Sequence, residues 1–176
     1  MPKYFLSIVI PVAIALFSIP AFAANEKDYT YLALGDSIAF GLDPRLLPLP
    51  SESLSNVDPF DFVGYPETVA ALTRSLQNTE LVNAACPGET SASFLNLGVP
   101  DLGCRVFKAQ AGLRAEYTGT QAAFAVTELR KNKKINLVTL NIGGNDLSML
   151  QYFCSTPPGP GGTLDPVCVK IGRAHV

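Results

Sequence analysis

Three short polar turns in this sequence carry the residue types that acyl-transfer chemistry needs. The first, Gly35-Asp36-Ser37, supplies a hydroxyl group. The second, Cys86-Pro87-Gly88-Glu89-Thr90, contains a glycine whose backbone N–H a substrate can approach closely, because no side chain covers it. The third, Gly143-Gly144-Asn145-Asp146, supplies a side-chain amide. A hydroxyl nucleophile surrounded by N–H donors can attack a carbonyl carbon and stabilise the resulting oxyanion.

These residue types suggest a definite set of roles. Ser37 is the candidate nucleophile. Its own N–H, the N–H of Gly88 and the side-chain amide of Asn145 are the candidate donors of an oxyanion hole. Each such donor contributes roughly 3 kcal/mol to the stability of the transition state.

Each turn also has a purely structural explanation. Serine and aspartate are common helix N-caps, a glycine after Pro87 suits a simple turn, and Gly143 and its neighbours suit a loop of left-handed residues. We expect Asp36, Gly143 and Asp146 to support the site by shaping these turns, the aspartates through hydrogen bonds, rather than to supply a catalytic acid. What favours a functional site is that each turn directly follows a predicted strand.

The strands are predicted from three short segments that are almost continuously apolar, a pattern typical of buried parallel strands. They are Tyr29 to Leu34, Glu80 to Ala85 and Ile135 to Ile142. The carboxyl ends of parallel strands lie at one edge of a sheet, and ligands bind there. We therefore expect the three polar turns to converge on one crevice.

Two amphipathic helical patterns lie between these strands, at residues 65–77 (YPETVAALTRSLQ) and 120–131 (TQAAFAVTELRK). Apolar residues recur at helical spacing in both, so we expect one face of each helix to pack on the sheet. The expected core-facing residues are Val69, Leu72, Leu76, Ala122, Ala125, Val126 and Leu129. Alternating strands and helices predict an α/β fold of βαβ units, with a parallel sheet covered on both faces.

Two longer loops lie outside this pattern. Residues 42–62 are rich in Pro, Ser and Asp yet carry several leucines and phenylalanines. This loop either packs on the core or forms an apolar lip beside the site, and the sequence favours neither arrangement. Residues 155–166 form a Gly/Pro-rich loop that we expect a Cys154–Cys168 disulfide to close at its base.

The first 23 residues have the organisation of a secretory signal peptide. Lys3 provides the positive start, residues 4–18 are mostly apolar, and Ala21-Phe22-Ala23 forms a small-x-small cleavage site. An uncleaved membrane anchor is the alternative, but the prolines and the Ala-x-Ala ending favour removal. We therefore expect a secreted or periplasmic protein without stable membrane insertion.

Export would place the four cysteines, Cys86, Cys104, Cys154 and Cys168, in an oxidising compartment, where an even number suggests disulfides. Of the possible connectivities, pairing by proximity joins Cys86 to Cys104 and Cys154 to Cys168. A zinc site is not expected, because no Cys-x-x-Cys spacing occurs and the sole histidine is His175. We predict neither a metal nor an organic cofactor.

Composition limits the class of protein. A chain of 176 residues is long enough for one domain, and 48% hydrophobic and 16% charged residues describe a globular protein. The net charge of −2 gives no electrostatic basis for binding nucleic acid. The one basic run, residues 130–134, suits a solvated helix C-terminus better than a binding patch.

The three turns and their flanking residues resemble the sequence blocks of the SGNH hydrolases, also called the GDSL esterase/lipase family. Residues 32–41 (LALGDSIAFG) are similar to the first block, 83–91 (NAACPGETS) to the glycine block and 140–147 (LNIGGNDL) to the Gly-x-Asn-Asp block. The cysteine in the second block resembles the secreted bacterial members. The resemblance implies a three-layer α/β/α flavodoxin-like fold over residues 24–170 and serine hydrolysis of esters. By position it makes Ser37 the nucleophile and Gly88 and Asn145 oxyanion-hole residues.

One block of that family has no counterpart in this sequence. The family's Asp-x-x-His block supplies the catalytic base and its orienting acid, and no such motif occurs here. We therefore expect the fold to be incomplete at its C-terminus and this polypeptide to have little or no esterase activity. Residues 171–176 (IGRAHV) match an in-frame translation of a common sequencing adapter, so we expect a non-native tail; a short natural tail is the alternative.

Together these features predict an exported serine hydrolase that cleaves acyl esters through an acyl-enzyme on Ser37. Its substrate would be a small-molecule, lipid or acylated-sugar ester, and the apolar residues of loop 42–62 hint at an apolar acyl group. An acyltransferase on the same scaffold is one alternative. A non-catalytic module that binds carbohydrate or lipid in the same crevice is the other.

Overall fold

The structure, a computed structural model, describes residues 28–49 and 52–155. The predicted signal peptide (1–23), the predicted non-native tail (171–176) and all but the first residue of loop 155–166 lie outside the described residues. Within the described part, no helix is both long enough and apolar enough to cross a lipid bilayer.

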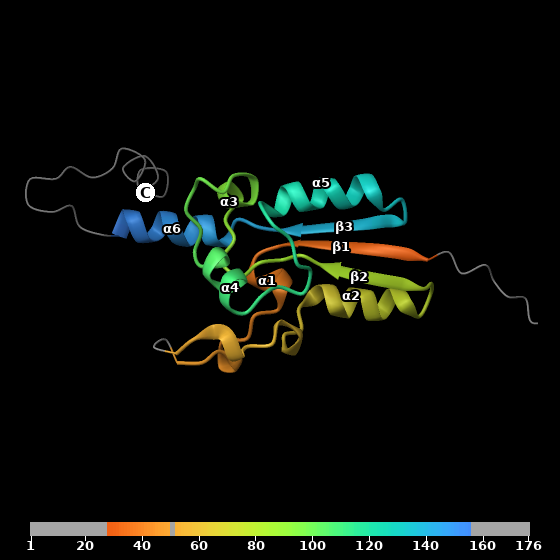
Figure 1. Cartoon of the computed structure of the whole chain (residues 1–176), viewed down its shortest axis with the longest axis horizontal. Helices are drawn as coiled ribbons and strands as arrows, with labels where there is room; N and C mark the ends of the chain where they lie inside the picture. The colour runs from red at the N-terminus through yellow and green to blue at the C-terminus, as the bar shows by residue number, and fades with distance from the viewer. Residues whose placement is uncertain (1–27, 50–51, 156–176) are drawn as a thin grey trace, which may run out of the picture.

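The described residues form a sheet of three parallel strands at the centre of the fold (Figure 1). The strands are β1 (Tyr29–Gly35), β2 (Thr79–Asn83) and β3 (Ile135–Asn141), in the order β2-β1-β3. β1 lies in the middle, and all of it after its first residue is buried. The three predicted strands are confirmed as parallel, with ends that differ from the prediction by one or two residues.

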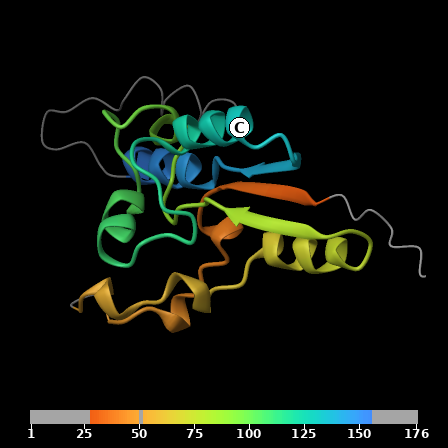
Figure 2. The ribbon, with the colours of Figure 1, turned by 45° about the vertical axis from the view of Figure 1, so that its right-hand side comes forward.

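Alternate side chains of β1 contribute to the cores on the two faces of the sheet. The helices that cover these faces are α2 (Tyr65–Arg74) and α5 (Gln121–Lys131). Leu32 clusters with Ala125 of α5 on one face, and Tyr31 clusters with Ala70 of α2 on the other. Figures 1 and 2 show the two helices on opposite sides of the sheet. The chain thus has an α/β fold, in which helices flank a parallel sheet of order 2-1-3.

The core-facing sides of these helices differ from those predicted. Four of the predicted core residues are exposed to solvent: Leu72, Leu76, Val126 and Leu129. In α2 the buried residues are Pro66 and Ala70, one helical turn apart, with Val69 packed beside them. Small side chains at the contact let α2 lie close to β2, and Leu72 on the adjoining face is exposed, whereas Leu76 lies beyond the end of α2. Ala125 is the corresponding buried contact of α5.

Four further helices lie at the carboxyl edge of the sheet in the described part of the chain. They are α1 (Ser37–Phe40), α3 (Ser91–Leu95), α4 (Cys104–Gln110) and α6 (Gly144–Ser155). In Figure 1 all three strand arrows point toward these helices. Segments that are far apart in the sequence therefore meet at one edge, as the predicted parallel sheet requires.

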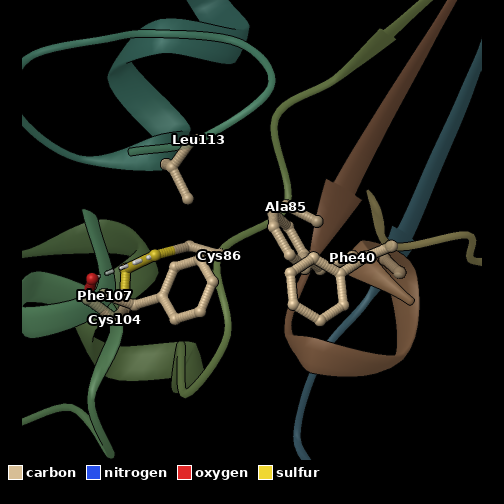
Figure 3. Close-up of a cluster of buried hydrophobic side chains, with 8 residues drawn as sticks. Phe40, Ala85, Cys86, Cys104, Phe107 and Leu113 are labelled. Atoms are coloured by element: carbon tan, nitrogen blue, oxygen red, sulfur yellow. Dashed lines mark hydrogen bonds between the residues drawn. A yellow bond between two sulfur atoms is a disulfide. The ribbon is translucent and has the colours of Figure 1, made fainter. Parts of the chain in front are cut away.

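A separate part of the core lies beyond the strand ends, around α1 and α4 (Figure 3). The ring of Phe40 lies 5.3 Å from that of Phe62 and 5.2 Å from that of Phe107, measured between centroids. The Cys86–Cys104 disulfide belongs to the same cluster and joins the turn after β2 to the start of α4. Aromatic packing and a covalent bond together fix the edge helices to the sheet.

Loop 42–62 combines the two arrangements that its sequence left open. Its described residues include three 3-10 helices: η1 (Pro44–Leu46), η2 (Leu54–Asn56) and η3 (Pro59–Asp61). Phe62 is buried in the cluster beside α1 and α4, whereas Phe60 is 69% exposed. Leu42 and Leu54 line a cleft beside Ser37. One part of the loop packs on the core, and another part forms an apolar lip.

The Cys86–Cys104 pairing predicted from proximity is confirmed. The predicted Cys154–Cys168 pairing stays a prediction, because Cys168 lies outside the described residues. Cys154 itself is not a free thiol.

Removing the Cys86–Cys104 disulfide should lower the free energy of unfolding by about 3 kcal/mol, because the two cysteines are 18 residues apart and the bond restricts the unfolded chain. The test compares urea unfolding of the oxidised protein with that of the Cys86→Ala/Cys104→Ala variant. Equal unfolding midpoints would contradict the presence of this bond in the folded protein.

Candidate active site

Ser37 lies at the junction between β1 and α1. The carboxylate of Asp36 caps this helix by accepting the N–H of Ile38 at 3.0 Å, and Asp36 is buried. Ser37 is therefore the first residue of α1, and its side chain is partly exposed. Among the described residues, none forms a hydrogen bond with the Ser37 hydroxyl or with its backbone N–H. Both groups are free to meet a bound molecule.

Gly88 lies where two backbone segments touch. Its φ angle is +84°, and a Cβ atom built on it would lie 2.4 Å from the carbonyl oxygen of Leu102. The Gly88 carbonyl in turn accepts the N–H of Leu102 at 2.8 Å. Only glycine fits this position without displacing the chain. Its N–H has no acceptor within the part of the chain that the structure describes.

Asn145 lies in the first turn of α6. Its Nδ2 donates to the backbone carbonyl of Glu89 at 2.8 Å. This hydrogen bond uses one of the two amide hydrogens and orients the side chain, which leaves the second hydrogen available to a ligand. The third turn is thereby tied to the second one.

Asp146 makes a further connection between these two turns. Its carboxylate accepts the backbone N–H of Ser91 at 2.9 Å and the Ser91 hydroxyl at 2.5 Å. Ser91 begins α3, so the carboxylate satisfies an N–H group at a helix start. Asp36 and Asp146 thus both bind backbone groups at the edge of the sheet.

Ser37, Gly88 and Asn145 line a single cleft of about 430 Å³. The structure therefore brings together the three residues predicted to act on substrate. The other walls of the cleft are mostly apolar and come from loop 42–62, the second turn, the segment before α4 and α4 itself: Leu42, Leu54, Pro87, Leu102, Val106 and Phe107. The Ser37 hydroxyl and the N–H groups of Gly88 and Asn145 thus share a cleft whose other walls are mostly apolar, an arrangement typical of small-molecule sites.

A second hollow, of about 510 Å³, is also lined by Ser37. Its walls include Ile38, Tyr65 and Thr68. A third hollow, of about 710 Å³, lies against α5 and contains none of the predicted site residues. Ser37 therefore lines two of these hollows.

Gln121, which is absent from the predicted site, connects the first two turns. Its side chain is completely buried. Its Oε1 accepts the N–H of Gly35 at 2.6 Å, and its Nε2 donates to the Gly35 carbonyl at 3.0 Å and to Oε2 of Glu89 at 3.3 Å. The sequence did contain a signal, because Gln121 lies four residues before Ala125 on the face of the helix that should be apolar.

Glu89 is a buried acid within this network, with 4% of its surface exposed. Burial raises the pKa of its carboxyl group, although the hydrogen bond from the Ser93 hydroxyl opposes this increase. The nearby negative charge of Asp101 raises the pKa further, and Lys108 opposes it. The side chain of Glu89 binds Gln121 while its backbone carbonyl binds Asn145, so this residue joins two sides of the site.

A general base for Ser37 is not found among the described residues. The sole histidine of the sequence, His175, lies outside them. Asp36 and Asp146 bind backbone groups, as described above, and neither is hydrogen-bonded to the Ser37 hydroxyl. The described residues therefore include the candidate nucleophile and the candidate N–H donors, but no candidate base.

One group of described residues has the donor types of a metal site. The ligand atoms of Cys86, Glu89 and Cys104 lie within 4.8 Å of one another. The two sulfur atoms are bonded to each other, so neither is the thiolate that a zinc ion binds. This group does not fit a metal ion while the disulfide is intact.

Comparison with known proteins finds no match for the chain among family models, curated proteins or solved structures. The fold and the cleft therefore carry the functional inference.

Gly88→Ala should destabilise the protein more than Gly119→Ala does. Both glycines have a left-handed φ, +84° and +80°, so each alanine incurs roughly 1–2 kcal/mol for that conformation. At position 88 the new Cβ also meets the Leu102 carbonyl, which adds roughly 1–3 kcal/mol, whereas nothing lies within 4 Å at position 119. Urea unfolding of the two variants isolates this contact, and equal losses would contradict the close approach.

The raised pKa of Glu89 makes stability depend on pH. Because this pKa lies above its ordinary value of 4.5, the folded protein retains a proton there that the unfolded chain loses. The free energy of unfolding should therefore fall as the pH rises from 4.5 toward neutrality. Glu89→Gln removes this titration and should flatten the dependence, measured by urea unfolding at several pH values. The exposed Glu52→Gln should keep the wild-type slope, and an unchanged slope in the Glu89 variant would refute the buried proton.

Proposed function

We propose that this chain carries the nucleophile and the oxyanion hole of an exported serine hydrolase that cleaves acyl esters. The observation that supports this proposal is the single cleft lined by Ser37, Gly88 and Asn145, which come from three different turns. The parallel strands bring these turns to one edge of the sheet, and the cleft lies there. Their residue types match the requirements of acyl transfer.

The finer fold assignment belongs to the same proposal. A sheet order of 2-1-3 is the beginning of the flavodoxin-like order 2-1-3-4-5. We infer that the described strands are the N-terminal portion of a three-layer α/β/α sheet of the SGNH hydrolase type. Ligands bind such sheets at the carboxyl ends of the strands, and the cleft lies at this edge.

The proposed reaction proceeds in two steps. The Ser37 oxygen attacks the carbonyl carbon of the ester as a base removes the hydroxyl proton, and the carbonyl oxygen becomes an oxyanion. The N–H groups of Ser37 and Gly88 and the second amide hydrogen of Asn145 stabilise this oxyanion, each by roughly 3 kcal/mol. Return of the electron pair expels the alcohol, which takes up a proton, and leaves an acyl-enzyme on Ser37. Water then hydrolyses the acyl-enzyme to a carboxylic acid and restores the serine.

Preorganisation of the donors supports this mechanism. The Asn145 amide is fixed by its bond to the Glu89 carbonyl before any substrate binds. Gly88 is held by its contact with Leu102. Donors fixed in advance stabilise the oxyanion without a reorganisation cost during the reaction.

The shape of the site supports an ester with one apolar side. The cleft beside Ser37 has apolar walls that include Leu54 and Val106, which suits the acyl group. The second hollow, which Ser37 also lines, includes Tyr65 and Thr68, which suits a more polar alcohol part. A disulfide at Cys86–Cys104 supports an extracytoplasmic location, because such bonds persist mainly in oxidising compartments.

The product of the complete gene, read from its genomic locus past the codon for Lys170, tests the proposal. We expect the downstream sequence to encode a strand followed by Asp-x-x-His. The protein should hydrolyse a p-nitrophenyl ester and react with a fluorophosphonate at Ser37. Ser37→Ala should abolish labelling and lower kcat by about a million-fold, whereas the exposed Ser55→Ala should change neither.

The 176-residue chain itself should show almost no turnover, since it lacks the Asp-x-x-His motif. A natural stop codon directly after Val176 would contradict the expected downstream base. An active gene product whose labelled residue is not Ser37 would overturn the proposed nucleophile. Transfer to an added alcohol in excess of hydrolysis would identify the acyltransferase alternative, and a complete but inert, unlabelled protein would favour a binding module.

A further inference from the structure

Gln121 lies where the turns of the proposed active site meet. It is the first residue of α5, whose N-terminal end lies at the carboxyl edge of the sheet (Figure 1). Its side chain is completely buried, yet it belongs to no hydrophobic cluster and does not line the cleft. A buried amide at this position needs polar partners, and it has three.

These partners lie next to the residues that would act on substrate. Gly35, which Gln121 binds through both its N–H and its carbonyl, is two residues before Ser37. Glu89, whose carboxyl group accepts from Gln121 Nε2, directly follows Gly88. The backbone carbonyl of Glu89 then accepts the Asn145 amide. One side chain thus connects, directly or through one residue, to all three turns.

An amide suits this position because the backbone of Gly35 offers both a donor and an acceptor. The Gly35 carbonyl also accepts the N–H of Cys86 at 3.0 Å, so it receives two hydrogen bonds at the same point. A side chain that only donates, or only accepts, would leave one buried backbone group unpaired. Glutamine supplies both functions in a planar group of fixed geometry.

We propose that Gln121 is a positioning residue, which holds Gly35 and Glu89 so that Ser37, Gly88 and Asn145 face one bound atom. This inference rests on the proposed function. A displacement of about 1 Å at such donors costs up to 100-fold in rate. Loss of Gln121 should therefore lower kcat of the complete gene product by roughly 10- to 100-fold and leave KM nearly unchanged, because the cleft walls do not include this residue.

The decisive variant is Gln121→Glu. Protonated glutamic acid has the shape and the acceptor of glutamine and one O–H donor for the Gly35 carbonyl, so it loses only the hydrogen bond to Glu89. Its carboxylate has no donor and lies beside Glu89. The ratio of variant to wild-type kcat should be low at neutral pH and should recover as the pH falls. The ionisable groups around the position are Glu89 and Tyr117, with Asp101 and Lys108 acting on Glu89. Burial and the adjacent acid both favour the protonated form.

Two further variants separate hydrogen bonding from packing. Gln121→Met has similar length but neither donor nor acceptor, so its kcat should stay low at every pH. Gln151→Glu introduces the same charge on the exposed surface of α6 and should keep the wild-type kcat. The proposal is supported if the kcat ratio recovers at low pH in Gln121→Glu but does not recover in Gln121→Met. Two results would overturn the proposal. One is a kcat at neutral pH within twofold of wild type in both Gln121 variants, and the other is an equal loss of kcat in both variants that does not vary with pH.

NMR measurements distinguish failure of this inference from failure of the proposed function. Full turnover by the Ser37→Ala variant would show that Ser37 is not the nucleophile and would refute the proposed function. Amide resonances test the role of Gln121 even in a protein that has no activity. In Gln121→Met the resonance of the Gly35 N–H should shift upfield, and those of the Gly88 N–H and the Asn145 side chain should move with it. Unmoved Gly88 and Asn145 resonances overturn the positioning role.

If the Gln121 variants do not fold, NMR of the wild-type protein still tests whether Gln121 binds Gly35. Nuclear Overhauser contacts between the Gln121 side-chain amide protons and the Gly35 N–H are expected, because Gly35 bonds both ends of that amide. Their absence overturns the inference, and their presence, with slow hydrogen exchange of the Gly35 N–H, supports it.

Discussion

The common direction of the three strands is the constraint on which the candidate site depends. Both strand pairs, β1 with β2 and β1 with β3, are parallel, so three separate parts of the chain end at the same edge. The hydrogen-bond ladder continues past the strands: the N–H of Asp36 donates to the Asn141 carbonyl, and the N–H of Cys86 donates to the Gly35 carbonyl, both at 3.0 Å. The turns are therefore extensions of the sheet, with positions set by the same hydrogen bonds. A sheet of mixed direction would separate Ser37 from Gly88 or Asn145.

Buried polar groups then fix the turns in finer detail. Asp36, Glu89 and Gln121 are all buried, and each one binds backbone or side-chain groups of the turns. Leaving such a group without a partner costs about 1–3 kcal/mol, so the alternative arrangements of this edge are unfavourable. The aromatic cluster of Phe40 and Phe107 and the disulfide between the second turn and α4 keep the same edge packed. The proposed stabilisation of an oxyanion requires N–H donors that are held in place before the substrate binds, and these contacts hold the turns that carry them.

The sequence predicted the features that depend on local pattern. Continuous apolar runs specified the strands, and the residue types at their ends specified Ser37, Gly88 and Asn145 as neighbours. Features that depend on distant contacts were missed or wrong. Leu72 and Leu76 have helical spacing but are exposed: the small side chains of α2 make its contact with the sheet, and α2 ends at Arg74, before Leu76. Gln121 acts through residues far away in the sequence, and only its polar character on an apolar face marked it. The sequence also could not decide which residues of loop 42–62 pack on the core and which line the cleft, because both arrangements depend on contacts with distant segments.

The third turn is held differently from the first two, and this difference gives Asn145 two tasks. β3 is an edge strand of the described sheet: its Ile135 and Leu137 pack on the core, whereas Val138 and Leu140 near its carboxyl end are 43% and 52% exposed. The third turn is joined to the second by two side chains, Asn145 and Asp146. Because Asn145 uses one amide hydrogen for this connection and has one left for a ligand, the group proposed to bind the oxyanion also determines where its own turn lies. A carboxamide is suited to both tasks, since a hydroxyl group has a single hydrogen to donate. Asn145 would thus be needed both to hold the third turn in place and to donate to the oxyanion. Asp146 gives the same turn a second attachment, which prevents rotation about a single hydrogen bond.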